Sequence, residues 1–172
     1  MQATDNILLN DPESLSYRRN SSTLVILGTG VIAFGFWGII KLAAQVFLGV
    51  QIFYPEDLET LGEDGVLFAT IIGFIVMFID VILRLIAGLK AINEGRGKKA
   101  GKGYLVILMW LIAGSAFSVF SVFLELLNLR GDFESNFVSI FMELTSLVIS
   151  LEVFIAGVSV KKYKKKRLGG IK

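Results

Sequence analysis

The sequence of 172 residues contains no cysteine and no histidine. The absence of cysteine excludes disulfides, thiol nucleophiles and thiolate metal sites, and the absence of histidine removes imidazole ligands and the most common general base. Charged residues are also scarce, at 19% of the chain, compared with about 25% in soluble domains. The remaining chemistry is that of carboxylates, amines, guanidinium groups and hydroxyls, and we expect neither a cofactor nor a metal centre.

Hydrophobic residues make up 54% of the chain and are gathered in long runs. Crossing the hydrocarbon core of a membrane takes about 20 helical residues, and helices satisfy their own backbone in lipid. The sequence therefore predicts an all-α polytopic membrane protein, a bundle of four transmembrane helices within residues 23–160. An N-terminal arm at 1–22 and a tail at 161–172 flank it. The predicted spans are 23–50, 66–90, 104–127 and 137–160.

Most of the 17 basic residues lie in three segments that alternate with acidic or nearly neutral loops. These three segments are the N-terminal arm, the middle loop NEGRGKKAGKG and the tail KKYKKKRLGGIK, whereas the first hairpin loop, QIFYPEDLETLGEDG, has no basic residue. Cytoplasmic loops carry an excess of lysine and arginine. We therefore expect both termini in the cytoplasm and two short loops outside.

The tail carries the densest positive charge of the chain. Basic residues near a membrane surface attract anionic lipid by about 1 kcal/mol each, so we expect the bilayer and its anionic headgroups as partners of the tail. Nothing in the sequence adds a nucleic-acid recognition element. The expected headgroup anchors are Lys161, Lys162, Lys164, Lys165, Lys166 and Arg167.

Two opposite charges interrupt the apolar stretch FIVMFIDVILRLIAGL, residues 74–89. Asp80 and Arg84 are four residues apart, so they share one helical face and can pair directly. Ionisable residues within a membrane are expensive and face protein or water. The pair therefore marks an inward-facing position close to the middle of the second span.

Depth along the helices suggests further partners for these charges. At about 1.5 Å of rise per residue, Arg84 and Glu152 both lie about 10–12 Å from the cytoplasmic ends of their spans, and Lys41 and Glu143 about 25–27 Å. Equal depth makes an Arg84–Glu152 pair and a Lys41–Glu143 pair geometrically feasible. With Asp80, these residues form the predicted intramembrane polar cluster.

The last span carries two polar faces that lie nearly opposite each other. Glu143, Ser146 and Ser150 share one face, and Glu152 and Ala156 lie on the other. We do not expect a helix with two polar faces to present either of them to lipid. We expect one face to line the bundle and the other to contact a second copy or another membrane protein.

Residues 87–108, AGLKAINEGRGKKAGKGYLVIL, resemble a pattern found in small four-span membrane proteins of Gram-positive bacteria. In that pattern a span ends in a Gly-Leu/Ile-x-Ala-x-Asn sequence, followed by a short basic turn and a new apolar span. Gly88, Leu89, Ala91 and Asn93 occupy the matching positions. The resemblance implies the four-span architecture and a location in a bacterial plasma membrane.

Two functional hypotheses remain open. In the first, the protein is a non-enzymatic accessory, regulatory or immunity-type membrane component that acts through helix contacts, and the polar cluster orders the bundle. In the second, it is an ion- or proton-coupled transporter or channel that uses Asp80 or Glu152. We do not expect an enzyme, because intramembrane hydrolysis uses a Ser–His pair, paired aspartates or a zinc helix, and Asp80 is the only aspartate within the predicted spans.

Overall fold

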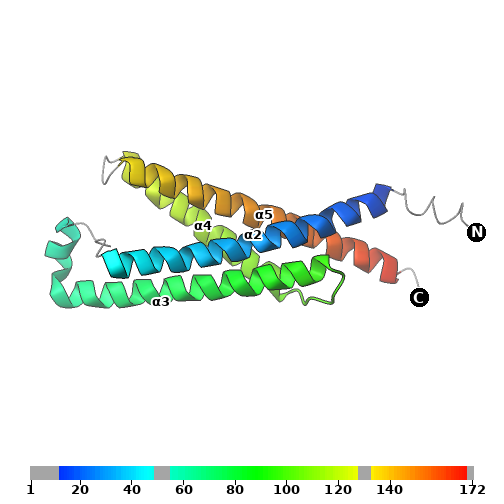
Figure 1. Cartoon of the computed structure of the whole chain (residues 1–172), viewed down its shortest axis with the longest axis horizontal. Helices are drawn as coiled ribbons and strands as arrows, with labels where there is room; N and C mark the ends of the chain where they lie inside the picture. The colour runs from blue at the N-terminus through cyan, green and yellow to red at the C-terminus, as the bar shows by residue number, and fades with distance from the viewer. Residues whose placement is uncertain (1–11, 49–54, 128–132, 170–172) are drawn as a thin grey trace, which may run out of the picture.

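A computed structural model describes residues 12–48, 55–127 and 133–169 of the chain (Figure 1). Every regular element in these ranges is a helix: α2 (Pro12–Leu48), α3 (Pro55–Gly95), α4 (Gly103–Leu127) and α5 (Phe133–Gly169). The four helices are long and apolar enough to cross a membrane. The predicted all-α fold with four transmembrane helices is therefore confirmed. The candidate spans are Pro12–Ile40, Asp64–Gly95, Gly103–Leu124 and Ile140–Lys166.

The helices continue beyond the apolar runs at both ends of the chain. The N-terminal arm is already helical from Pro12, and the basic tail remains helical to Gly169. Proline suits the first turn of a helix because its missing N–H has no partner there in any case, and both α2 and α3 begin at a proline. Near its start α3 kinks at Gly62, whose backbone has φ 68° and ψ 169°, a conformation that glycine adopts readily.

Helix α3 ends in a Schellman motif, at the start of the turn to α4. The N–H of Lys98 donates to the carbonyl of Asn93, and the N–H of Gly97 donates to the carbonyl of Glu94. Gly97 takes the left-handed conformation, with φ 80°, which this helix end requires and which glycine provides without steric cost. The basic middle loop therefore terminates α3 with a specific backbone structure, in addition to connecting α3 to α4.

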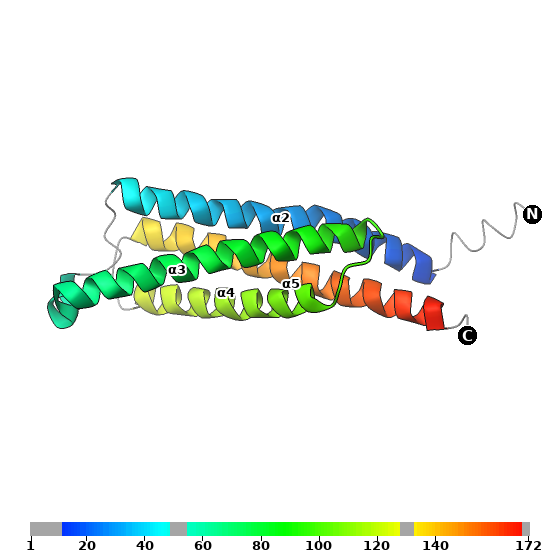
Figure 2. The same ribbon diagram turned by 90° about the horizontal axis from the view of Figure 1, so that it is seen from below.

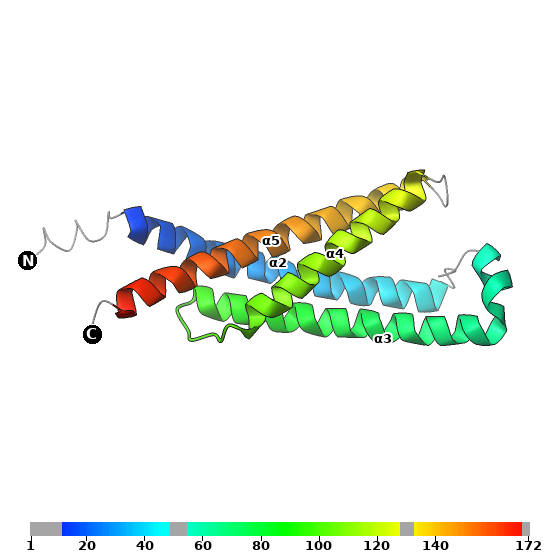
Figure 3. The ribbon, with the colours of Figure 1, turned by 180° about the vertical axis from the view of Figure 1, so that it is seen from behind.

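The helices form two antiparallel hairpins, α2–α3 and α4–α5. The start of α2, the end of α5 and the α3–α4 turn lie at one end of the bundle, called here the basic end. The end of α2, the start of α3, the end of α4 and the start of α5 lie at the other, the far end (Figures 1 and 2). Helix α2 packs against α3 and α5, and α4 packs mainly against α5. Toward the far end the α4–α5 hairpin diverges from α2–α3 (Figures 1 and 3).

The core occupies only the half of the bundle nearest the basic end. Its largest fully buried side chains include Leu24, Leu108, Val153 and Tyr104. No described residue is buried in α2 after Gly35, in α3 before Val81, in α4 after Ser115 or in α5 before Ser146. The two hairpins thus share a packed core at one end and separate at the other.

Candidate functional site

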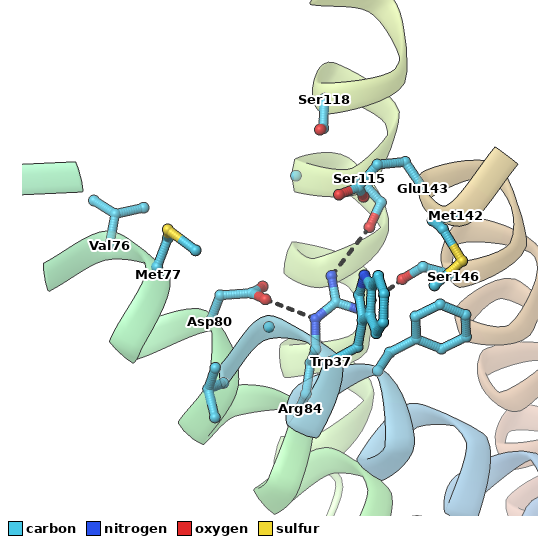
Figure 4. Close-up of a pocket in the computed structure, with 14 residues that line it drawn as sticks. Trp37, Val76, Met77, Asp80, Arg84, Ser115, Ser118, Met142, Glu143 and Ser146 are labelled. Atoms are coloured by element: carbon cyan, nitrogen blue, oxygen red, sulfur yellow. Dashed lines mark hydrogen bonds and ion pairs between the residues drawn. The ribbon is translucent and has the colours of Figure 1, made fainter. Parts of the chain in front are cut away.

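A cavity of about 370 Å³ opens at the point where the two hairpins separate. All four helices contribute to its walls, and its polar lining includes Asp80 and Arg84 from α3 and Glu143 from α5 (Figure 4). We call this cavity the cleft. Its lining residues are Phe34, Trp37, Gly38, Val76, Met77, Asp80, Val81, Arg84, Gly114, Ser115, Ser118, Met142, Glu143 and Ser146.

Arg84 forms the centre of the polar network at the cleft floor. Its Nε donates to Asp80 Oδ2 at 2.6 Å, one turn earlier on α3, which is the ion pair that the spacing predicts. Its Nη1 donates to Ser146 Oγ at 2.5 Å and its Nη2 to Ser115 Oγ at 3.4 Å. The guanidinium group, in a residue only 8% exposed, therefore ties α3 to both helices of the other hairpin.

The predicted pairing of Arg84 with Glu152 is not formed. A long side chain on a helix points back toward the helix N-terminus, and the N-terminus of α3 lies at the far end. The guanidinium group is therefore carried away from the basic end, past the level of Glu152, to the level of Ser146. Glu152 is exposed on the opposite side of α5.

Glu143 and Lys41 were the second pair that equal depth predicted. Glu143 is half-buried and lines the cleft, as expected for the inward face of the last span. The side chain of Lys41 lies outside the described residues, so the Lys41–Glu143 pair stays a prediction. Within the described part of the chain, Glu143 forms no ion pair and no hydrogen bond through its side chain.

A second charged cluster lies at the basic end, where the sequence indicated only a loop. The carboxylate of Glu94 accepts hydrogen bonds from Lys161 at 3.1 Å and from Lys164 at 2.6 Å, and the residue is 2% exposed. The signal that could have found it is its spacing, because Glu94 continues the buried face of Ala87 and Ala91 by a further turn. We call these three charged residues, Glu94, Lys161 and Lys164, the basic-end cluster.

Lys161 also fixes the turn between α3 and α4. Its ammonium group donates to the carbonyls of Ala100 at 2.9 Å and Gly101 at 3.2 Å. It lies 5.0 Å from the ring centroid of Tyr104, within the range of a cation–π interaction. One lysine therefore joins the tail, the turn and the first residues of α4.

The predicted headgroup anchors divide into two groups. Lys161 and Lys164 point inward to Glu94, and Lys166 pairs with Glu13 at the start of α2. Lys162 and Lys165 are exposed, whereas the side chain of Arg167 lies outside the described residues. Lys161 and Lys164 share the face of α5 that meets α3, because the tail continues this helix and residues three apart lie on one face.

No protein-family model, curated protein or solved structure matches the chain. In the described ranges, no three or more acidic side chains gather in a way that could hold a metal ion. The cleft can instead offer carboxylate charge, serine hydroxyl groups and aromatic surface. The network at its floor can also hold the two hairpins in a fixed relation.

Proposed function

We propose that this protein is a non-enzymatic accessory or regulatory component of a bacterial plasma membrane, and that it contacts another membrane protein through α5. The observation that carries the proposal is the position of Glu152. This carboxylate lies near the middle of the candidate span Ile140–Lys166, and it is exposed on the outside of the bundle.

The surroundings of Glu152 are those of a lipid-facing surface. Ile155 is 60% exposed, Val148 50% and Leu151 39%. An acidic or basic side chain at the centre of a membrane helix costs about 2.5–3.5 kcal/mol on insertion scales, so such residues are rare outside protein contacts. A second protein surface that covers Glu152 removes this cost.

Charge complementarity favours one kind of occupant. The partner is a transmembrane helix of a different protein that places a lysine, arginine or other hydrogen-bond donor at the depth of Glu152. Polar side chains that bond across helices contribute about 1–2 kcal/mol in membranes. The exposed apolar residues on the same side of α5 supply the remaining helix contact.

A photo-crosslinking amino acid at Ile155 tests this proposal in the membranes of the source organism. We expect a discrete adduct that is retained in Glu152→Asp and lost in Glu152→Leu. The matched control position is Phe117, which is 73% exposed on α4 and should give no discrete adduct. An adduct with twice the mass of this chain would instead indicate a second copy, and an adduct unaffected by Glu152→Leu would overturn the role of the carboxylate.

We further propose that both termini lie in the cytoplasm and that the exposed lysines of the tail attract anionic lipid. Support comes from the basic end, which gathers the tail, the middle loop and the start of α2 on one side of the bundle (Figure 1). Positive charge concentrated at one end favours the cytoplasmic side.

A second candidate function, cation- or proton-coupled transport, is favoured by the cleft. The side chain of Asp80 remains 42% exposed although it pairs with Arg84. Proton or cation flux into proteoliposomes should then be lost in Asp80→Asn, in a variant that remains folded, and retained in Glu152→Gln, because Glu152 lies outside the cleft. Absence of flux with the wild-type protein would contradict this candidate.

A further inference from the structure

The acidic and basic groups of the cleft do not balance. Among the described residues of its lining, Arg84 is the only basic one, against the two carboxylates of Asp80 and Glu143. The Nε, Nη1 and Nη2 atoms of Arg84 are all engaged, with Asp80, Ser146 and Ser115. With both carboxylates ionised, the lining carries one net negative charge that the described residues do not neutralise.

The two carboxylates come from different hairpins. Asp80 projects from α3 and Glu143 from α5, and both reach into the space between those helices (Figure 4). A positive charge between them would interact with both, and the low dielectric of the membrane interior makes such an interaction stronger than in water. The geometry therefore suits one cationic centre held within the cleft.

The rest of the lining is unsuited to a divalent inorganic cation. Calcium takes six to eight oxygen ligands, and magnesium keeps an octahedral shell of oxygens. The cleft instead offers the aromatic rings of Phe34 and Trp37 and the thioethers of Met77 and Met142. Aromatic faces attract organic cations, and methionine adapts to apolar bodies of irregular shape.

Size and access agree with this chemistry. A volume of about 370 Å³ falls within the range of about 300–1,000 Å³ typical of small-molecule sites. The packed core lies on the basic-end side of the cleft, and the two hairpins diverge toward the far end (Figure 3). A ligand that enters from the far half therefore does not have to cross the core.

We propose that the cleft is a binding site for a monovalent organic cation with an apolar body, of the quaternary ammonium or phosphonium class. Asp80 and Glu143 hold the charge, and Phe34 and Trp37 contact the apolar body. The site goes beyond both candidate functions above, because binding requires neither a partner at Glu152 nor transport.

The two tryptophans of the chain provide a direct test. Trp37 lines the cleft, whereas Trp110 is 72% exposed on α4. In Trp110→Phe, reconstituted as the full chain in nanodiscs, Trp37 is the only tryptophan. Titration with tetraphenylphosphonium should give a saturable change in its fluorescence. In Trp37→Phe, the remaining Trp110 should give no saturable change.

Variants at two glutamates on α5 identify the charge involved. Glu143→Gln should weaken the binding of tetraphenylphosphonium by about tenfold, equivalent to roughly 1.4 kcal/mol. The matched control Glu152→Gln makes the same chemical change outside the cleft and should leave binding unchanged. Uncharged triphenylphosphine oxide should produce no saturable response from Trp37.

Three results would overturn the proposal. The first is a lack of saturable response from Trp37 in a protein whose unfolding temperature is normal. The second is equal binding of the uncharged phosphine oxide, which would show that the cationic charge is not recognised. The third is an equal weakening of tetraphenylphosphonium binding by Glu143→Gln and Glu152→Gln, which would show that the carboxylate in the cleft has no special role. None of these results affects the crosslinking test at Ile155. The cation site and the partner contact at Glu152 can therefore be overturned independently of each other.

Discussion

Gly88 of α3 lies directly against Gly28 of α2, where the backbones of the first hairpin meet. A Cβ atom at residue 88 would lie 2.6 Å from the carbonyl oxygen of Gly28 and 2.6 Å from Cγ1 of Ile32. Small residues allow membrane helices to approach closely, and van der Waals packing between the helices then holds them together. This contact sets the spacing of the hairpin and, through α3, the position of Arg84.

Gly88→Ala should therefore destabilise the protein by about 1–3 kcal/mol, the usual cost of overpacking. The added methyl group meets backbone on α2, so the helices must separate. A lower unfolding temperature in mild detergent would report the effect. The matched control is Gly73→Ala on the same helix, because a Cβ there has no heavy atom within 4 Å; equal destabilisation by both changes would contradict the role of the close contact.

Arg84→Met should destabilise the bundle by roughly 1–3 kcal/mol, because it leaves polar groups without a partner. Asp80, Ser115 and Ser146 all lose a donor. The double variant Asp80→Asn/Arg84→Met should recover part of the loss, since replacing both charges of a pair is often neutral. Unfolding temperatures of the single and double variants measure the coupling, and additive losses would show that the pair does not act as a unit.

Glu94→Gln should loosen the turn between α3 and α4. The change removes the charge that holds Lys161 and Lys164, and Lys161 in turn binds the carbonyls of Ala100 and Gly101. A local loss of roughly 1.4 kcal/mol raises the open population about tenfold, and cleavage of a transiently open segment follows that population. Trypsin should then cut the turn faster in detergent.

Glu143→Gln serves as the control for this experiment, because it makes the same chemical change in the cleft, away from the turn. Its tryptic pattern should match that of the wild-type protein. If Glu94→Gln also cleaves at the wild-type rate, the basic-end cluster does not fix the turn.

The proposed membrane orientation predicts the labelling of single cysteines. Because the chain contains no cysteine, each introduced thiol is the only reactive one. Asp64 and Gly101 are both exposed. Asp64 lies in the first part of α3, toward the far end, and Gly101 lies in the turn after α3, at the basic end. A membrane-impermeant thiol reagent should label Asp64→Cys in intact cells, and Gly101→Cys only after the membrane is opened. The reverse pattern would place both termini outside.

The helices of this protein were predictable because the signal for each one is local. Four apolar runs of sufficient length specify four membrane helices, and a separation of four residues specifies that Asp80 and Arg84 share a face. The spans did not predict where the helices end: α2 begins at Pro12 and α5 continues to Gly169, beyond the apolar runs. A polar segment can continue a helix at the membrane surface, where hydropathy no longer marks its limit.

Small residues recur along one face of α3, but only part of this face is packed against another helix. Ala87 and Ala91 are buried, whereas Gly73 on the same face is exposed. The pattern of small residues indicates which face of the helix is suited to close packing. Whether another helix lies there depends on the crossing of the two hairpins, which no single segment specifies.

The sequence by itself determined the number of membrane helices, the basic and acidic loops and the Asp80–Arg84 pair, because each follows from the composition or spacing of one segment. Only the tertiary structure decided that Arg84 reaches Ser115 and Ser146, that Glu94 is buried under two lysines and that Glu152 faces outward. These relations depend on the rotation and tilt of each helix and on the direction of long side chains. Equal depth in the membrane brings two charges to one level, but it does not turn them toward each other.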